Sequence, residues 1–356
     1  MILLGSTGSI GVNTLAVAER FHIRVETLVA GNNIELLTQQ ILKFQPCYVC
    51  VATKELARQI DHPRVYWGEE GILEVIRQSG SMIVVNALVG FLGLRPTIVS
   101  IEEGKTVALA NKESLVAAGA FIHPDHLRPI DSEHFGLWYL LNGRKPKKMM
   151  ITASGGAFRD TPIDQIEHAT LEEALNHPNW SMGAKITIDS ATMTNKLFEL
   201  LEARWLYGCE HIDAVIEPKS IVHALVEFSD GATTAQMAHP DMKLPIAYAL
   251  MQKVDEPILE PVDLLEVGAL EFHAISPDRY PIWQIKEDLL KHPKLGVIVN
   301  AANEVGIRKF SEGSIPFGRI SELTLAAYDR FHDANPQTLD DVFAIDKTVR
   351  EWCETR

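Results

Sequence analysis

The sequence predicts an α/β protein in which a doubly wound parallel sheet is followed by an α+β domain and a helical C-terminal domain. Over residues 1–115, short apolar strands alternate with helical segments, which is typical of a parallel sheet with crossover helices. Over residues 116–255 the pattern changes to strands that flank a polar, helix-rich middle. A proline-rich connector at 256–281 precedes residues 282–356, which are helical in pattern almost throughout.

The strands of both sheets can be named from their apolar runs. The first domain contains "MILL", "RVETLVA", "YVCVA", "VYWG", "SMIVVNALVG" and "TVALAN". The second contains "KKMMITASGG", "SIVHALVEFS" and "ATTAQMAHP", which we expect to pair antiparallel in one sheet.

The stretch "LLGSTGSIG" at residues 3–11 places glycines at Gly5, Gly8 and Gly11, directly after the first strand. Glycine can adopt the backbone angles that a sharp strand-to-helix turn requires, and its lack of a side chain lets a phosphate approach the backbone at the start of the helix. The segment therefore predicts a dinucleotide site, with a ligand-free glycine turn as the alternative.

The second strand, "RVETLVAGNN", ends in Ala30, Gly31, Asn32 and Asn33. A carboxylate at this position usually holds the ribose 2′-hydroxyl of NAD and would repel a 2′-phosphate. The absence of an acid therefore favours NADP. No arginine or lysine stands at this tip either, so the sequence does not identify the partner of the 2′-phosphate.

Composition narrows the class of protein. The chain has 356 residues, 46% of them hydrophobic, and a net charge of −14 without basic runs, so we expect no nucleic-acid partner. No apolar run of membrane-spanning length and no leader segment is visible, which predicts a cytoplasmic protein without a membrane partner. Cys47 and Cys50 form C-x-x-C in an apolar strand, where core packing is favoured over a redox or zinc pair.

Carboxylates suggest a metal site. Asp131 and Glu133 stand one residue apart in "PIDSEHFG", and on an extended segment both would face the same way. Glu199 follows Asn195 by four residues, which places the two on one helix face. Three carboxylates would select Mg²⁺ or Mn²⁺ over zinc. The alternative is a solvated surface pair.

Seven segments follow one another along the chain: "GSTGSIG", "ANKESLV", "DSEH", "SGGAFR", "HPNWSMG", "DSATMTNK" and "NAANE". Together they resemble the 1-deoxy-D-xylulose 5-phosphate reductoisomerase family across essentially the whole chain. The resemblance implies a homodimer that uses NADPH and a divalent metal. It also implies the metal-dependent rearrangement and reduction of a phosphorylated sugar, 1-deoxy-D-xylulose 5-phosphate, to 2-C-methyl-D-erythritol 4-phosphate in non-mevalonate isoprenoid biosynthesis.

The resemblance also assigns roles around the substrate. It implies Asp131, Glu133 and Glu199 as metal ligands and Lys112 as a nearby catalytic cation. The substrate residues that it implies are Ser132, Ser154, His177, Trp180, Ser190, Asn195 and Lys196. The "HPNWSMG" segment looks like the family's lid, with Trp180 over the substrate, although Trp180 could instead be a core residue and Ser154 only a turn residue. The role of His223 stays open.

On the cofactor side, the resemblance implies contacts to NADPH from two turns and two later segments. The residues are Thr7, Gly8, Ser9, Ile10, Gly31, Asn32, Asn33, Asn111, Glu113 and Met242. Many members have a basic residue where Asn32 stands, so the grip on the 2′-phosphate is weaker or comes from elsewhere. Two alternatives remain: an NADP-dependent dehydrogenase that performs no rearrangement, and a non-catalytic nucleotide sensor.

Overall fold

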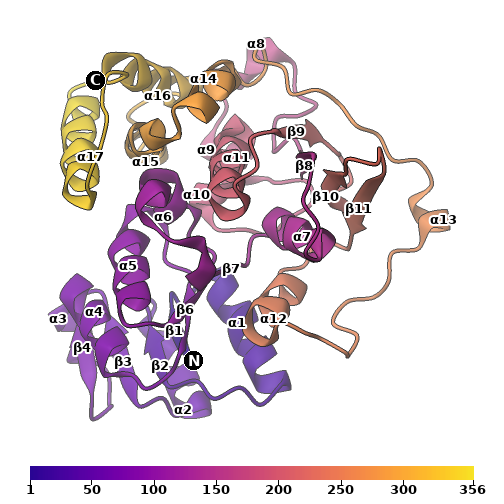
Figure 1. The fold of residues 1–356 in the computed structure, drawn as a ribbon. Helices are drawn as coiled ribbons and strands as arrows, with labels where there is room; N and C mark the ends of the chain where they lie inside the picture. Colours follow the sequence, from indigo (N-terminus) through magenta and orange to yellow (C-terminus); the bar gives the residue numbers. More distant parts are fainter. The chain divides into compact units, whose positions relative to one another are not determined.

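The computed structural model describes residues 1–356 and divides into two compact units (Figure 1). Unit 1 comprises Met1–Ser114, His123–Ser132 and Asp241–Leu259. Unit 2 comprises Leu115–Ile122, Glu133–Pro240 and Glu260–Arg356.

Unit 1 is built on a seven-stranded, fully parallel sheet with the order β4-β3-β2-β1-β5-β6-β7. Its strands are β1 (Ile2–Leu4), β2 (Thr27–Val29), β3 (Tyr48–Val51), β4 (Val65–Trp67), β5 (Ile83–Asn86), β6 (Thr106–Leu109) and β7 (Leu127–Pro129). The order reverses beside β1, as in a doubly wound fold, and the prediction of a parallel sheet is confirmed.

Helices cover both faces of this sheet, because successive strand residues point to opposite sides. The helices of unit 1 are α1 (Ser9–Arg20), α2 (Ile34–Phe44), α3 (Lys54–Ala57), α4 (Gly68–Gln78), α5 (Leu94–Glu102) and α12 (Lys243–Met251). Leu3 packs in the core cluster that contains residues of α1, α2 and α12, whereas Ile2 and Leu4 pack with residues of α4 and α5. Cys50 is fully buried in that second cluster, which agrees with the prediction of core packing.

Two segments that the sequence placed in the central domain contribute to unit 1. Strand β7 adds to the edge of the parallel sheet beside β6. Helix α12 packs Ile246, Ala247 and Leu250 into the core that also contains Leu3. Neither segment carries a local signal of its partner, because long-range packing rather than periodicity assigns an apolar stretch to a particular core.

Unit 2 contains a four-stranded sheet with the order β11-β10-β8-β9. Its strands are β8 (Lys148–Ala153), β9 (Ile212–Ile216), β10 (Val222–Glu227) and β11 (Thr233–Met237). The three predicted strands pair antiparallel as expected. The sheet is mixed rather than wholly antiparallel, because β9 pairs parallel to β8.

The remaining helices of unit 2 include the predicted helical C-terminus. They are α7 (Ser132–Leu141), α8 (Ile163–Ile166), α9 (Leu171–Leu175), α10 (Ala184–Thr192), α11 (Thr194–Tyr207), α13 (Leu264–Val267), α14 (Lys286–Lys291), α15 (Gly296–Ser311), α16 (Gly318–Arg330) and α17 (Leu339–Glu354). Helix α6 (Lys112–Ala118) begins in unit 1 and continues into unit 2. Helices α15, α16 and α17 pack together at the end of the chain (Figure 1).

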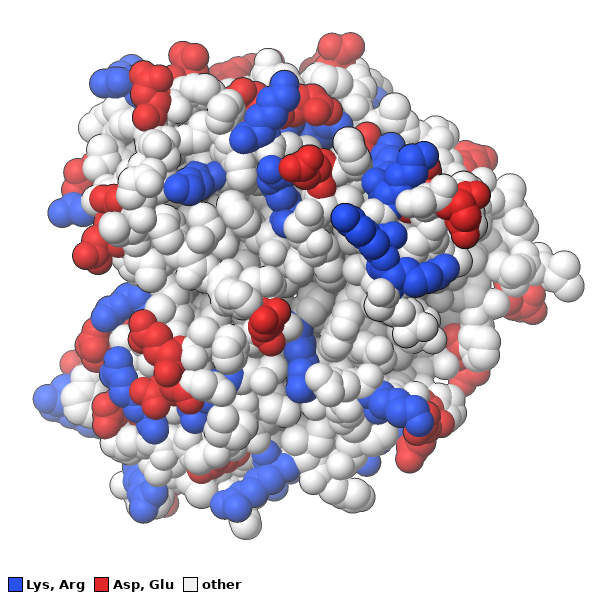
Figure 2. Space-filling model, viewed as in Figure 1, with Lys and Arg blue, Asp and Glu red and all other residues white.

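The charges on the face drawn in Figure 2 are mixed. Acidic and basic side chains alternate there, and neither sign forms a continuous patch. None of the helices combines the length and apolar character required to cross a bilayer.

Candidate active site

The glycine turn after β1 is shaped by close backbone contacts. Gly5 has φ +86°, and a Cβ on it would lie 2.4 Å from the carbonyl oxygen of Ala87. A Cβ on Gly11 would lie 2.2 Å from the carbonyl oxygen of Gly5. Both positions therefore require glycine. Helix α1 starts at Ser9 after the N-cap residue Gly8, which makes no side-chain cap, so the first-turn N–H groups stay available to an anion.

The turn after β2 carries no carboxylate over residues 30–34, as the sequence indicated. Asn33 is the N-cap of α2, and its Oδ1 accepts a hydrogen bond of 3.1 Å from the backbone N–H of Leu36. Asn32 and Gly31 are exposed beside it. Thr7, Ser9 and the partly buried Ile10 stand in the first turn, so the two turns predicted to contact NADPH follow adjacent strands of one sheet.

The segment "ANKES" begins with a side chain that is used structurally. Asn111 is 1% exposed, and its Nδ2 donates to the carbonyl oxygens of Leu88 and Gly90, at 2.9 and 2.8 Å, and to Glu113 at 3.0 Å. These bonds occupy its donors, so its side chain shapes this loop instead of offering a free amide. Met242, also predicted near the cofactor, packs against the core cluster of unit 1.

Lys112 and Asp131 form an ion pair at the edge of unit 1. The Nζ atom of Lys112 lies 2.7 Å from Oδ2 of Asp131, and their side chains are 6% and 10% exposed. A pair this well shielded from solvent keeps most of its electrostatic strength. The structure therefore places the predicted catalytic cation on one of the predicted metal ligands.

In unit 2, the two predicted glutamate ligands meet at one ammonium group. Nζ of Lys196 lies 2.8 Å from Oε1 of Glu133 and also contacts Oε2 of Glu199. Asn195 donates from Nδ2 to Oε1 of Glu199 at 2.5 Å, which confirms that the two residues share a face of α11. Glu199 is 1% exposed, so this spot already favours positive charge between two carboxylates.

The extended conformation assumed for the segment that carries Asp131 and Glu133 was wrong. Helix α7 starts at Ser132, so Glu133 lies in its first turn and not on an extended segment. An i, i+2 pair shares a face on a strand but not on a helix. Asp131 stands directly before the helix, and the chain itself keeps it within two residues of Glu133, about 7 Å between Cα atoms.

Ser154 and His177 form the next part of the site. Nδ1 of His177 accepts backbone N–H groups from Asn179 at 3.1 Å and from Trp180 at 2.9 Å, so the proton of the neutral ring is on Nε2. Nε2 then donates to Oγ of Ser154 at 2.8 Å, and the N–H of Gly156 donates to the same oxygen. The hydroxyl proton of Ser154 is therefore free to donate.

Burial, assisted by the nearby charge of Arg159, lowers the pKa of His177 from 6.5 to about 4. The ring is neutral at physiological pH. Ser190 lies in the last turn of α10, two residues before the end of the helix at Thr192. It is half-buried, and its hydroxyl group makes no hydrogen bond within the protein. Two serine hydroxyls, one histidine and the amine of Lys196 thus supply donors suited to a phosphate.

The segment 177–183 is non-helical and ends at Gly183, the N-cap residue of α10. Trp180 is only half-buried, and its ring packs edge-on against His223, with the centroids 6.0 Å apart. Nε2 of His223 lies 3.1 Å from the carbonyl oxygen of Ala238. The ring of Trp180 is therefore only partly enclosed by the protein.

One residue of this region was quoted but given no role in the sequence analysis. Arg159 closes the "SGGAFR" segment, and its Nη1 donates to the carbonyl oxygens of Ser154 at 2.9 Å and Pro218 at 3.1 Å. The sequence offered no signal for these bonds because backbone acceptors leave no trace in residue type.

Comparison with known proteins identifies the family. Models of the 1-deoxy-D-xylulose 5-phosphate reductoisomerase and of its two C-terminal domains match residues 1–119, 127–207 and 237–352. The chain belongs to the 1-deoxy-D-xylulose 5-phosphate reductoisomerase family. As a member it is an NADPH-dependent and metal-dependent oxidoreductase.

Individual reductoisomerases match over nearly their whole length. The protein of Nautilia profundicola is 56% identical, covering 100% of this chain and 99% of the relative. The protein of Wolinella succinogenes is 51% identical, with 99% of each covered.

Solved reductoisomerase structures also have the same fold as this chain over nearly its whole length. A crystal structure in complex with NADPH, fosmidomycin and magnesium has a TM-score of 0.93 at 34% identity and covers 99% of this chain and 97% of its own. The Zymomonas mobilis reductoisomerase in complex with NADPH has a TM-score of 0.88 at 33% identity, with the same coverage.

The residues present fit both groups that the reductoisomerase family uses. The predicted metal ligands are all carboxylate oxygens, which suit magnesium. The glycine turn has a cradle that a Cβ would fill and an uncapped helix N-terminus, which suit a pyrophosphate.

Proposed function

We propose that this chain converts 1-deoxy-D-xylulose 5-phosphate to 2-C-methyl-D-erythritol 4-phosphate with the residues described above. The observation that carries the proposal is the meeting of Glu133 and Glu199 at Lys196, beside the phosphate-type donors of unit 2. Two carboxylates far apart in sequence are gathered at one cation, and Asn195 fixes the second of them. The side chain of Glu133 is 15% exposed and that of Glu199 is 2% exposed, so both carboxylates are held at this cation and largely shielded from solvent.

Asp131, Glu133 and Glu199 would hold Mg²⁺ or Mn²⁺. When bound, the ion supplies Lewis-acid polarisation of a carbonyl and stabilises negative charge on neighbouring oxygens. Lys112 orients the carboxylate of Asp131 through their 2.7 Å ion pair. Asn195 orients Glu199 in the same way from the helix face that they share.

The substrate phosphate would be bound by Ser154, Ser190, Asn195, Lys196 and His177. Ser154 donates its own proton, because its oxygen already accepts from His177 and Gly156. His177 acts as a neutral orienting group, since its pKa is lowered to about 4. Ser132 would donate to a substrate hydroxyl, and Trp180 would exclude water above the sugar.

NADPH would be bound by unit 1. The N–H groups at Ser9 and Ile10, at the N-terminus of α1, would face the pyrophosphate together with Thr7 and Gly8. The exposed turn of Gly31, Asn32 and Asn33 would contact the adenosine ribose without repelling a 2′-phosphate. Asn111, Glu113 and Met242 would border the nicotinamide side, Asn111 through the loop that it holds.

The chain would act as a homodimer. Strand β11 is an edge strand that pairs only with β10, and Thr233, Thr234 and Ala235 are exposed along it. An open edge with uncharged side chains is suited to pairing with a second copy. Light scattering of the purified protein would show a dimer, and a monomer at micromolar concentration would refute this. A cytoplasmic location is part of the same proposal, to be checked by fractionation.

The test of the reaction is consumption of NADPH with 1-deoxy-D-xylulose 5-phosphate, with and without Mg²⁺. We expect turnover only with both the substrate and the metal, and 2-C-methyl-D-erythritol 4-phosphate as the product by NMR. Reduction without a change in the carbon skeleton would instead identify a simple dehydrogenase. Tight NADPH binding without any turnover would identify a nucleotide sensor.

A further inference from the structure

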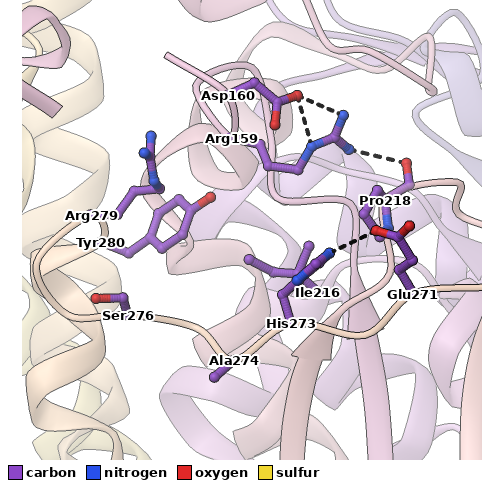
Figure 3. A pocket seen from close by; sticks show the side chains of 10 residues that line it. All are labelled: Arg159, Asp160, Ile216, Pro218, Glu271, His273, Ala274, Ser276, Arg279 and Tyr280. Atoms are coloured by element: carbon purple, nitrogen blue, oxygen red, sulfur yellow. Dashed lines mark hydrogen bonds and ion pairs between the residues drawn. The ribbon is translucent and has the colours of Figure 1, made fainter. Parts of the chain in front are cut away.

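Two side chains hold the backbone carbonyl groups of Ser154 and Gly155. Nη1 of Arg159 donates to the carbonyl oxygen of Ser154 at 2.9 Å, and the hydroxyl of Tyr280 donates to the carbonyl oxygen of Gly155 at 2.8 Å. Arg159, Pro218 and Tyr280 line one pocket of about 420 Å³ (Figure 3). Two successive carbonyl groups are thus drawn toward side chains that line this pocket.

The direction of these carbonyls fixes the direction of the following N–H groups. In a trans peptide the C=O of one residue and the N–H of the next point in opposite directions. The N–H of Gly155 therefore points away from Arg159. Gly155 is buried, and its N–H donates to no group of the protein. A buried peptide donor without a partner is rare and fits an anion bound beside the Ser154 hydroxyl.

Arg159 also reaches the segment 177–183 through a shared acceptor. The carbonyl oxygen of Pro218 accepts from Nη1 of Arg159 at 3.1 Å and from Nδ2 of Asn179 at 2.7 Å. Nδ2 of Asn179 also donates to Oγ of Ser220 at 2.7 Å. A carbonyl oxygen has two lone pairs, so these two donors complete its hydrogen bonding. Asn179 stands between His177 and Trp180, the two residues assigned to the substrate.

The guanidinium group of Arg159 is pre-oriented for this double contact. Its Nε and Nη2 donate to one carboxylate oxygen of Asp160, at 3.0 and 2.9 Å (Figure 3). This leaves Nη1 directed at the carbonyl oxygens of Ser154 and Pro218. A planar guanidinium fixed on one edge positions its remaining donors, which a flexible ammonium cannot do.

We propose that Arg159 is a positioning residue that couples the phosphate-binding loop at Ser154–Gly156 to the 177–183 segment through the carbonyl of Pro218. The inference rests on the proposed function, because it takes Ser154 as a phosphate ligand. Arg159 keeps the hydrogen-bond donors of the loop directed at the phosphate. It also holds the carbonyl oxygen of Pro218, which accepts a hydrogen bond from Asn179. Phosphate seating and closure of the segment therefore depend on one side chain that touches neither substrate nor cofactor.

The test compares Arg159→Met with Arg279→Met. Arg279 is the matched control, because its Nη1 donates to the carbonyl oxygens of Phe158 and Thr161 in the same loop but to neither Ser154 nor Pro218. We expect Arg159→Met to raise the KM for the substrate and the Kd for inorganic phosphate by about tenfold or more, as for loss of a charge-assisted hydrogen bond. The Kd for NADPH should stay within about twofold of wild type, because NADPH binds unit 1. Arg279→Met should lower the melting temperature with little change in KM.

A double-mutant cycle with Asn179→Ala measures the coupling. Because Arg159 and Asn179 share one acceptor, Asn179→Ala should raise KM less in the Arg159→Met background than in wild type. Arg159→Lys should recover part of the loss, and it carries the comparison if Arg159→Met does not fold. Equal KM effects of the two arginine variants, or strictly additive effects in the cycle, would overturn the proposal. Failure of wild type to turn over the substrate would instead refute the proposed function.

Discussion

Replacement of Glu199 by glutamine tests the metal site most directly. If like-charge repulsion among the three carboxylates were the only effect, the Glu199→Gln variant would be more stable than wild type in the absence of metal. The structure predicts the opposite, a less stable variant, because Glu199 is 1% exposed and its carboxylate accepts hydrogen bonds from Lys196 and Asn195. Hydrogen bonds to a charged group contribute about 1.5–3 kcal/mol and neutral ones about 0.5–1.5 kcal/mol, so the substitution should cost about 1–2 kcal/mol in chelator.

The expected effect on metal binding is larger than the effect on folding. Mg²⁺ at a hundredfold excess over its Kd stabilises a protein by about 2.7 kcal/mol. If loss of one anionic ligand raises the Kd at least tenfold, the same concentration stabilises the variant by at most about 1.4 kcal/mol. Each kcal/mol corresponds to about 2–4 °C in a unit of this size. Calorimetric scans in chelator and in rising Mg²⁺ would therefore show at most half of the wild-type shift.

Asp346→Asn provides the matched control. Asp346 is a buried carboxylate of α17, also paired with a cation, Arg350, at 2.7 Å. Its loss should lower stability in chelator while leaving the Mg²⁺-dependent shift unchanged. A Glu199→Gln protein with the full wild-type shift and near-normal turnover at limiting Mg²⁺ would refute the assignment of Glu199 as a ligand.

Three further outcomes are expected. The kcat/KM with NADPH should exceed that with NADH by at least about tenfold, or ~1.4 kcal/mol. Asn32→Lys should strengthen the binding of NADPH more than that of NADH. Equal kcat/KM for the two coenzymes would contradict the interpretation of the turn after β2. Trp180→Ala should lower turnover while thermal stability and NADPH affinity stay near wild type, whereas a strongly destabilised variant would make Trp180 a core residue. His177 should titrate by NMR near its lowered pKa of about 4 rather than 6.5. Because the unfolded chain binds this proton first as pH falls, stability should decrease between pH 6.5 and 4, and His177→Asn should remove that component.

The parts of the site that sequence could predict are those fixed by local geometry. The glycine turn was predictable because Gly5 and Gly11 occupy positions where any Cβ would collide with backbone. The pairing of Asn195 with Glu199 followed from helix periodicity alone. The absence of an acid after β2 is likewise a direct property of the sequence.

The parts that could not be predicted depend on where distant segments meet. No local sequence pattern indicates that β9 pairs parallel to β8 in a sheet whose other strand pairs are antiparallel. The helix that carries Asn195 and Glu199 begins only after Met193, which adopts φ +69° between α10 and α11. Arg159 escaped notice because its partners are carbonyl oxygens, which every residue possesses. The role of the resemblance was to supply the ligand set that spacing alone left open.

The division of unit 1 among three stretches of chain has a consequence for biosynthesis. Helix α12 buries Ile246, Ala247 and Leu250 in the core that Leu3 and Leu28 also occupy. A ribosome synthesises these residues only after the whole of residues 133–240, at about 5–20 residues per second. For at least several seconds, the part of the apolar core of unit 1 that α12 covers therefore stays exposed. The second unit must begin to fold while the first still waits for its last helix, so a fragment ending near residue 119 should be poorly soluble and dependent on chaperones.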